Sequence, residues 1–182
     1  MLRIIGGSKK RMKLKAPKDY DKIRPTMKLL KKAIFDLIGP EIIGADILDL
    51  YSGTGALSIE ALSRGAESAV LVDKDSAAIK LINENLEISG FTDKATVIQD
   101  DIYNFVNNLT PNKSFDFIFV DPPYDNLPGE DLIIKLLDFL REDGVLFMET
   151  RAKDEVLFDD REEYILQTRF YGKTKLYIVI KR

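Results

Sequence analysis

The chain has 182 residues and a net charge of −3, with 45% apolar residues and neither cysteine nor histidine. This length and apolar content suit one domain with a sizeable core. The two missing residue types exclude disulfides, thiolate metal sites and the commonest general base. No apolar run reaches the length of a membrane span, and no signal peptide opens the sequence. We therefore expect a cytoplasmic protein without a metal, whose chemistry depends on carboxylates, amides, hydroxyls and positioning.

Positive charge gathers in an N-terminal arm. Residues 1–32 hold 12 Lys and Arg against two Asp, whereas residues 33–182 hold 15 Lys and Arg against 28 Asp and Glu. An anionic body repels RNA, so we expect the arm to face it. Because Tyr20 is its one aromatic residue, contacts to phosphates are favoured over base stacking; a solvated terminus is the alternative. The residues that we assign to RNA contact are Arg3, Lys9, Lys10, Arg11, Lys13 and Arg24.

Apolar periodicity predicts the elements in chain order. Within the arm, Gly6-Gly7 lies among apolar residues that can pin a hairpin, and a helix capped by Thr26 then runs to Gly39-Pro40. Strands are predicted at 46–51, 69–73, 95–99, 115–120 and 144–149, with helices near 56–64, 76–89, 101–109 and 130–141. This alternation indicates a mainly parallel sheet with right-handed crossovers. Runs 163–170 and 175–181, joined around Gly172, predict a closing hairpin.

The first of these strands enters a glycine-rich turn, Asp49-Leu50-Tyr51-Ser52-Gly53-Thr54-Gly55. Gly53 and Gly55 permit tight or positive-φ geometry and let a ligand approach the backbone. A dinucleotide-binding turn is the obvious competitor, but the third glycine of its pattern is replaced by Ser58, and Asp49 would repel a pyrophosphate. An acid at this place suits a cationic ligand. S-adenosylmethionine, which carries a sulfonium and an ammonium and has no phosphate, fits that description.

Two further acids follow predicted strands. Asp73 stands 24 residues after Asp49, near the offset at which an acid meets ribose hydroxyls in doubly wound folds. Asp100-Asp101-Ile102 follows the third strand, where a carboxylate can take the adenine amino group. Each acid alone is most simply a helix N-cap, but these strand ends share the edge of the sheet where ligands bind. The cofactor residues that we assign are Asp49, Tyr51, Ser52, Gly53, Gly55, Asp73, Lys74, Asp101 and Ile102.

The fourth strand, 115–120, ends in Asp121-Pro122-Pro123-Tyr124. These residue types are suited to binding a planar group that carries an NH₂. The Asp121 carboxylate accepts one N–H, a carbonyl beside the prolines accepts the other, and the ring lies on the flat face of the base. The alternative is a polar turn, because Asp-Pro and Pro-Pro are common there. We assign Asp121, Pro122, Pro123 and Tyr124 to catalysis.

Together these segments resemble the RsmD-type family, bacterial methyltransferases that modify a guanine N2 of small-subunit ribosomal RNA. The resemblance runs from Arg3 to about Lys181. The glycine turn and Asp-Pro-Pro-Tyr occur in many methyltransferases, whereas other motifs are narrower. The further motifs are Arg3-Ile4-Ile5-Gly6-Gly7, Arg24-Pro25-Thr26, Glu60-Ala61-Leu62-Ser63-Arg64-Gly65-Ala66 and Tyr171-Gly172-Lys173-Thr174-Lys175-Leu176. Two departures are mild: Asp73 stands where relatives often carry Glu, and Tyr51-Ser52 where Phe-Ala is usual.

The resemblance implies a class I S-adenosylmethionine-dependent methyltransferase. Its α/β fold is Rossmann-like, with a mainly parallel seven-stranded sheet, a C-terminal antiparallel hairpin and a basic N-terminal extension. Residues 1–32 would contact ribosomal RNA or the small ribosomal subunit, and residues 33–182 would form the catalytic body of a single domain, which we take to be monomeric. The acceptor would be the exocyclic N2 of a guanine in 16S rRNA, of the type at position 966.

The expected reaction is an in-line displacement in which the guanine amine attacks the sulfonium methyl. Positioning can supply on the order of 7–11 kcal/mol of the barrier reduction, and Asp121 with the Pro122 carbonyl would stabilise the developing charge. Methylation of adenine N6 in RNA and a non-catalytic RNA-binding assembly factor remain alternatives. A nicotinamide dehydrogenase is disfavoured by Ser58 and the missing histidines.

Some polar residues carry no function in this interpretation. We predict that Asn83 and Asn85 lie on a solvated helix face and that Arg64 is a cation near a helix C-terminus. The core is predicted to include Phe35, Phe91, Phe105, Phe139 and Phe147.

Overall fold

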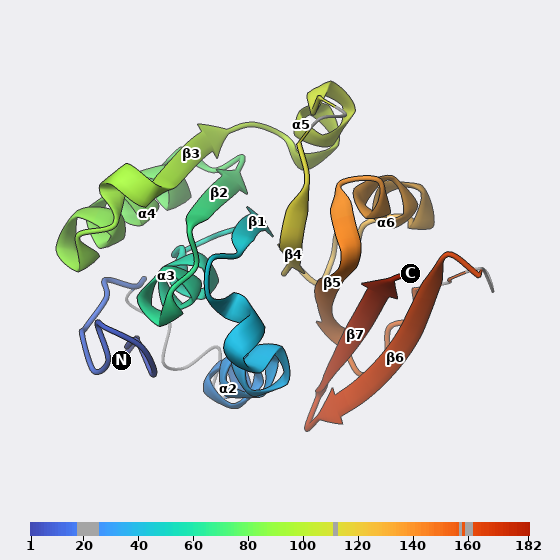
Figure 1. Cartoon of the computed structure of the whole chain (residues 1–182), viewed down its shortest axis with the longest axis horizontal. Coiled ribbons are helices and arrows are strands. Elements are labelled where there is room, and N and C mark those ends of the chain that lie inside the picture. The colour runs from blue at the N-terminus through green and yellow to red at the C-terminus, as the bar shows by residue number, and fades with distance from the viewer. Residues whose placement is uncertain (18–25, 111–112, 157, 159–161) are drawn as a thin grey trace.

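Seven strands form one sheet within the residues that the computed structural model describes, which are 1–17, 26–110, 113–156, 158 and 162–182 (Figure 1). Their order across the sheet is β3-β2-β1-β4-β5-β7-β6. Neighbours among the first five strands are parallel, and β7 is antiparallel to both β5 and β6. The strands are β1 Asp46–Leu50, β2 Ser68–Asp73, β3 Ala95–Gln99, β4 Phe115–Val120, β5 Leu140–Arg151, β6 Tyr164–Tyr171 and β7 Thr174–Lys181.

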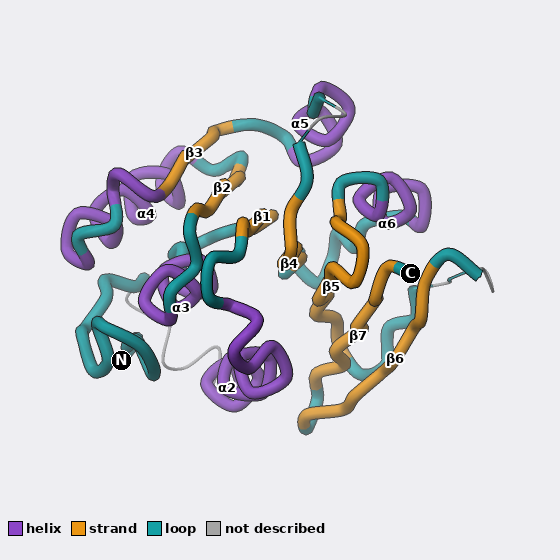
Figure 2. Tube along the Cα trace, in the orientation of Figure 1, coloured by secondary structure: helices purple, strands orange, loops and turns teal. Residues whose placement is uncertain are grey.

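Helices cover both faces of the sheet (Figures 1 and 2). The helices are α2 Thr26–Ile38, α3 Ala56–Arg64, α4 Ser76–Ser89, α5 Ile102–Asn108 and α6 Glu130–Leu137, with 3₁₀ turns at Gly39–Ile42 and Thr92–Lys94. The first three lie on one face with the arm, and α5 and α6 lie on the other. Successive strand residues point to opposite faces, so Ile47 of β1 packs in one core and Leu48 in the other. Among the described helices, none combines the length and apolar character needed to span a membrane.

The predicted architecture is confirmed, and the clearest boundary error is at α6. The prediction extended this helix over 130–141, but α6 ends at Leu137. The Phe139 carbonyl accepts the N–H of Phe115 at 2.8 Å, so strand pairing takes over at this point. β5 consequently begins at Leu140, not at 144, and its register with β4 shifts before Val145.

The arm folds back on itself, and its apolar residues enter the core. Arg3 and Lys13 form an antiparallel bridge, and the N–H of Ile4 donates to the Met12 carbonyl at 3.0 Å. Ile4 and Leu14 are 1% and 6% exposed and belong to the same core cluster as α2 and α3. The expected hairpin is therefore present, and its apolar side is packed against the body.

Candidate functional site

A cleft of about 760 Å³ opens where β1, β2 and β4 end. Its volume lies in the range of small-molecule sites, and the carboxyl edge of a parallel sheet is where ligands bind in such folds. The arm contributes Ala16 and Pro17 to one wall. Six of the residues assigned from the sequence line it: Asp49, Tyr51, Ser52, Gly53, Asp73 and Asp121.

The turn between β1 and α3 is held in an unusual conformation. Tyr51, which is not a glycine, has a φ of 61°, and Gly55 at the start of α3 has a φ of 70°. Glycine adopts a positive φ readily, but for Tyr51 the conformation is strained, and such strained residues cluster at functional sites. The hydroxyl of Ser52 donates to the Asp49 carbonyl at 2.6 Å, and the Gly55 N–H donates to the Ser52 carbonyl at 2.8 Å. A Cβ on Gly55 would lie 3.2 Å from Leu71, so glycine keeps the turn tight against β2.

Asp49 is a buried carboxyl at the floor of the cleft. It is 2% exposed, and the Ser58 hydroxyl donates to its Oδ2 at 2.7 Å. The pKa of Asp49 is raised to about 7, mainly by burial and also by the negative charges of Asp121 and Asp73, while the hydrogen bonds from Ser58 oppose the shift. Ser58, which stands at the third glycine position of the dinucleotide-binding pattern, thus donates a hydrogen bond to Asp49 here. The resulting negative potential favours a cationic ligand.

Asp73 lines the same cleft and accepts two backbone hydrogen bonds there. One carboxylate oxygen accepts the Gly53 N–H at 2.9 Å, and the other accepts the Asp75 N–H at 3.0 Å. Asp75 in turn caps α4 by accepting the Ala77 N–H at 2.9 Å. Asp73 therefore joins the glycine turn to the start of α4 and lines the cleft, and its contact with a ribose stays a prediction.

Four assigned cofactor residues are not among the described residues that line the cleft: Gly55, Lys74, Asp101 and Ile102. Lys74 is exposed, and Ile102 is buried in the core under α5. The Asp101 carboxylate caps α5 by accepting the Tyr103 N–H at 3.0 Å. The helix-cap alternative thus describes the local contacts of Asp101, and contact of these four residues with a cofactor stays a prediction.

The Asp-Pro-Pro-Tyr segment leaves β4 directly into the site. The Asp121 N–H donates to the Leu50 carbonyl at 3.4 Å, which extends the pairing of β4 with β1. Pro122 is buried, and the Pro123 carbonyl accepts the Asn126 N–H at 2.9 Å, so the segment closes into a turn after Asp121. Because the Pro123 carbonyl is engaged in this turn, the Pro122 carbonyl is the candidate that would accept an amine N–H beside the Asp121 carboxylate.

Tyr124 is held from two sides by residues of β5. Its hydroxyl donates to Oε1 of Glu149 at 3.1 Å, and the Arg151 guanidinium lies 5.1 Å from the ring centroid. Glu149 is only 6% exposed. Sequence reasoning missed this residue, although a lone acid inside the apolar run of β5 was a usable signal, because charged residues are seldom buried without a partner.

The prediction that Asn85 is solvated is wrong. Its side chain is fully buried: Oδ1 accepts the Lys15 N–H at 2.7 Å, and Nδ2 donates to the carbonyls of Lys15 at 3.1 Å and Thr54 at 2.9 Å. Asn85 thus connects the arm to the glycine turn. Asn83 is exposed, as predicted, and donates to the Ile79 carbonyl one turn earlier.

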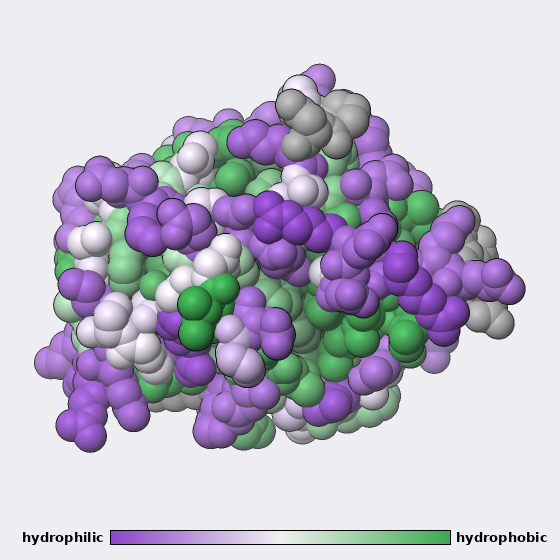
Figure 3. Space-filling model, in the orientation of Figure 1, coloured by the Kyte–Doolittle hydropathy of each residue, from purple (hydrophilic) through white to green (hydrophobic). Residues whose placement is uncertain are grey.

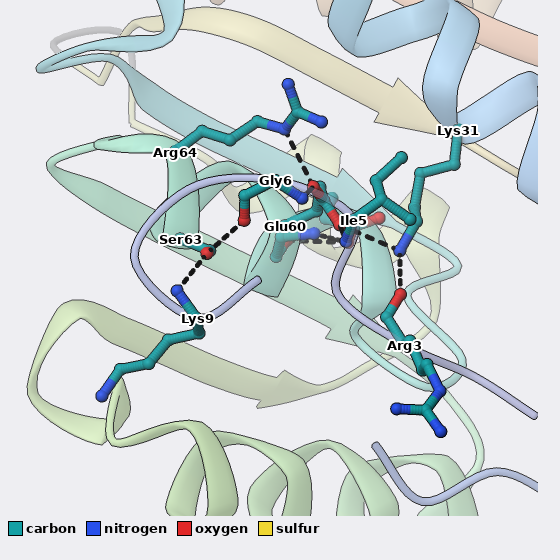
Figure 4. A network of polar contacts seen from close by, with 10 residues as sticks. Arg3, Ile5, Gly6, Lys9, Lys31, Glu60, Ser63 and Arg64 are labelled. Carbon is teal, nitrogen blue, oxygen red and sulfur yellow. Dashed lines mark hydrogen bonds and ion pairs between the residues drawn. The ribbon is translucent and has the colours of Figure 1, made fainter. Parts of the chain in front are cut away.

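A second buried group, Glu60 of α3, fixes the start of the arm (Figure 4). Its two oxygens accept the N–H groups of Ile5 at 2.8 Å and Gly6 at 2.7 Å. They also pair with Lys31 at 3.0 Å and Arg64 at 2.8 Å. Burial lowers the pKa of Lys31, and the Glu60 charge opposes that shift. Arg64 is therefore part of this network, in addition to standing at a helix C-terminus as predicted.

The side chains of Arg3 and Lys9 point away from this network, whereas Lys31 lies within it (Figure 4). Arg3, Lys10, Arg11 and Lys13 are exposed, while Lys9 is half-buried with its ammonium 5.9 Å from the Phe91 ring. The corner of the molecule that carries the arm is strongly hydrophilic (Figure 3). Arg24, the sixth residue assigned to RNA contact, lies outside the described residues.

This sheet order, the glycine turn after β1 and the acids at the ends of β1, β2 and β4 define the chain as a class I S-adenosylmethionine-dependent methyltransferase. A family model described as "Conserved hypothetical protein 95" matches residues 2–180. The chain belongs to this family, the RsmD-type methyltransferases.

Individual relatives agree with that assignment. "Putative rRNA methyltransferase YlbH" of Bacillus subtilis is 35% identical, with all of both chains covered. "Ribosomal RNA small subunit methyltransferase D" of Escherichia coli is 32% identical over 84% of this chain and 76% of its own length. The solved structure of "Putative methyltransferase yhhF" from Escherichia coli is 27% identical and superposes with a TM-score of 0.83, covering 100% of this chain and 98% of that one.

Proposed function

We propose that this protein transfers a methyl group from S-adenosylmethionine to the exocyclic N2 of a guanine in small-subunit ribosomal RNA, of the position-966 type. Methylation of ribosomal RNA is supported by the names of the relatives. The guanine N2 target is supported by the motifs shared with the RsmD-type family and by the carboxylate of Asp121, which can accept a hydrogen bond from an amino group. The observation that carries the proposal is that Asp121, at the end of β4, lines the same cleft as the glycine turn.

The residues of the cleft fit the cofactor. Asp49 and Asp73 offer carboxylates to an ammonium and to ribose hydroxyls, and the turn at Gly53 and Gly55 admits a ligand close to the backbone. Among the described residues, no three acids, histidines or cysteines gather where they could hold a metal ion. When bound, the cofactor supplies a methyl group whose bond to sulfur breaks as its bond to the acceptor nitrogen forms and a proton leaves that nitrogen.

The protein's own part is to hold the acceptor amine. The Asp121 carboxylate accepts one N–H of the amine and the Pro122 carbonyl accepts the other, which draws the nitrogen toward tetrahedral geometry and stabilises its developing positive charge. Tyr124 stacks on the base, with its hydroxyl fixed by Glu149. A base must leave its stack to reach this place, which is easiest in a loop or an open junction of the RNA.

RNA is held by the arm in this proposal. The exposed cations of residues 3–13 lie on the outer side of a hairpin whose inner side is packed on the body. They offer phosphate contacts that position the substrate without reading its sequence. Residues 33–182 carry the chemistry, and the protein acts as a cytoplasmic monomer without a metal.

The test gives labelled methyl donor to the enzyme, with naked 16S rRNA and with small subunits that lack the modification. We expect N2-methylguanosine as the labelled nucleoside. Asp121→Ala should abolish transfer while cofactor binding, measured by calorimetry, survives, and Asp138→Ala at the exposed end of α6 should leave both unchanged. A label on adenine N6, or a substantial rate for Asp121→Ala, would contradict the proposal.

A further inference from the structure

The N-terminal arm meets the body both at α3 and at the cofactor cleft. Near its turn the arm lies on α3 (Figure 1), where the Ser63 carbonyl accepts the Ser8 N–H at 2.7 Å. A Cβ on Gly7 would lie 1.7 Å from that same carbonyl oxygen, so the backbone of the hairpin rests directly on the helix. Farther along the chain, Ala16 and Pro17 line the cleft. One continuous segment therefore runs from α3 to the wall of the cofactor site.

At the cleft the arm is held by α4. The Lys15 ammonium pairs with Glu84, which also lines the cleft, at 3.0 Å, and the backbone N–H and carbonyl of Lys15 are both bonded to the Asn85 amide. The ion pair is partly exposed to solvent and therefore weak, whereas Asn85 is fully buried. The same amide donates to the Thr54 carbonyl of the glycine turn at 2.9 Å. Asn85 is thus the side chain through which the position of the arm affects the turn.

The outer side of the same hairpin carries the exposed cations Arg3, Lys10, Arg11 and Lys13. Arg3 and Lys13 face each other in the antiparallel bridge, and Lys13 stands two residues before Lys15. The cationic surface and the wall of the cleft therefore belong to one segment. A phosphate backbone that contacts several of these cations restrains the hairpin on the body, whichever bases it carries.

Two ligands that restrain one segment bind cooperatively. A cofactor in the cleft requires Ala16 and Pro17 in their places on its wall, and RNA on the outer side requires the same hairpin in its place. The ligand that binds first orders the segment, so the second ligand loses less conformational entropy when it binds. By thermodynamic linkage, each ligand then raises the affinity of the other by the same factor.

We propose that RNA on the arm and the cofactor in the cleft bind cooperatively, and that Asn85 is the positioning residue that transmits this coupling. The inference rests on the RNA contact of the arm proposed above. It goes beyond that contact, because the protein then binds its cofactor most tightly when its substrate is present.

The test measures the affinity of labelled S-adenosylhomocysteine by equilibrium dialysis, with and without saturating 16S rRNA or small subunits that lack the modification. This ligand has no sulfonium, so attraction between RNA phosphates and a sulfonium charge does not contribute. We expect RNA to tighten its binding by about 5- to 150-fold, and the ligand to tighten RNA binding by the same factor. Each ligand alone should also slow hydrogen exchange of the Lys15 amide. Equal affinities with and without bound RNA would overturn the proposal.

Asn85→Leu separates coupling through the arm from direct contact between RNA and cofactor. It removes the link between Lys15 and Thr54, so the factor should fall to near one. Asn83→Leu, on the exposed face of the same helix, is the matched control and should keep the wild-type factor. An undiminished factor in Asn85→Leu would show that the coupling does not pass through this residue, and the proposal would fail.

Unfolding in urea verifies that Asn85→Leu is folded. If it is not, the two wild-type affinities and the exchange of the Lys15 amide still decide whether the ligands are coupled through the arm. A protein that binds neither the RNA nor the subunits contradicts the function proposed for the arm. RNA that binds without changing the affinity for S-adenosylhomocysteine contradicts only the cooperativity, so the two failures are distinguishable.

Discussion

Asn85 holds Lys15 by both of its backbone groups, accepting the N–H at 2.7 Å and donating to the carbonyl at 3.1 Å. The same side chain donates to the carbonyl of Thr54 inside the glycine turn. The next two residues of the arm, Ala16 and Pro17, line the cofactor cleft. The basic arm is thus tied to the turn that receives the cofactor, and one fully buried amide makes the connection.

Replacement of Asn85 by Leu should loosen the arm and weaken the cofactor site together. It leaves the Lys15 groups and the Thr54 carbonyl without their partner, at a cost of roughly 1–3 kcal/mol in the free energy of unfolding. We expect the Lys15 amide to exchange hydrogen faster and S-adenosylhomocysteine to bind more weakly in calorimetry. Asn83→Leu, on the exposed face of the same helix, is the control and should change neither. Unchanged exchange at Lys15 in Asn85→Leu would show that the side chain does not hold the arm.

Glu60→Gln should destabilise the protein strongly. The change removes a fully buried charge from two cations, Lys31 and Arg64, and from two backbone N–H groups. Removal of one partner from a buried ion pair costs about 3–5 kcal/mol. Glu67→Gln is the matched control, because Glu67 is 70% exposed and its ion pair with Lys94, at 3.4 Å, lies at the surface. Its effect on the free energy of unfolding, measured with urea, should stay within about 0.5 kcal/mol. Equal effects of the two substitutions would contradict the role given to Glu60.

These two residues also show where sequence reasoning ends. The glycine turn and the acids at strand ends were predictable, because each follows an apolar run within a few residues and the edge of a parallel sheet brings such ends together. Asn85 and Glu60 find partners 54 to 70 residues away in the arm. Their local pattern is that of ordinary helix residues, so nothing nearby predicts burial. Glu149 is similar, since only the register of β4 against β5 places it beside Asp121.

The arm's contribution to RNA affinity can be measured through its salt dependence. Lys10 and Arg11 are exposed at the tip of the hairpin, whereas the backbone of Lys9 is bound to Ser63. Changing Lys10 and Arg11 to Gln should weaken binding of 16S rRNA and reduce the slope of log affinity against log salt by about 1 to 2, one step for each lost phosphate contact. Neutralising Lys113 and Arg169 is the control, because both are exposed and lie before the central strand β4 and on the edge strand β6. A full slope in the arm variant would show that these residues do not touch phosphates.

Asp49 should make both stability and cofactor affinity depend on pH. Burial raises its pKa in the folded protein to about 7, from the ordinary value of 3.8. The folded state therefore holds the proton more tightly than the unfolded chain. The favourable contribution of Asp49 to stability is present below about pH 4 and is lost as the pH rises to about 7. Relative to Asp49→Asn, the free energy of unfolding of the wild type should fall across that interval and level off above it.

Cofactor affinity should change in the opposite direction with pH. A cationic ligand binds the ionised carboxylate better, so wild-type affinity for S-adenosylmethionine in calorimetry should rise as the pH increases toward about 7 and flatten beyond it. Asp49→Asn should bind more weakly at high pH and lack this slope. Asp73 and Asp121 are unchanged in the variant, so the difference between the two proteins isolates Asp49. Parallel pH profiles in wild type and variant would mean that Asp49 does not titrate against the bound cation.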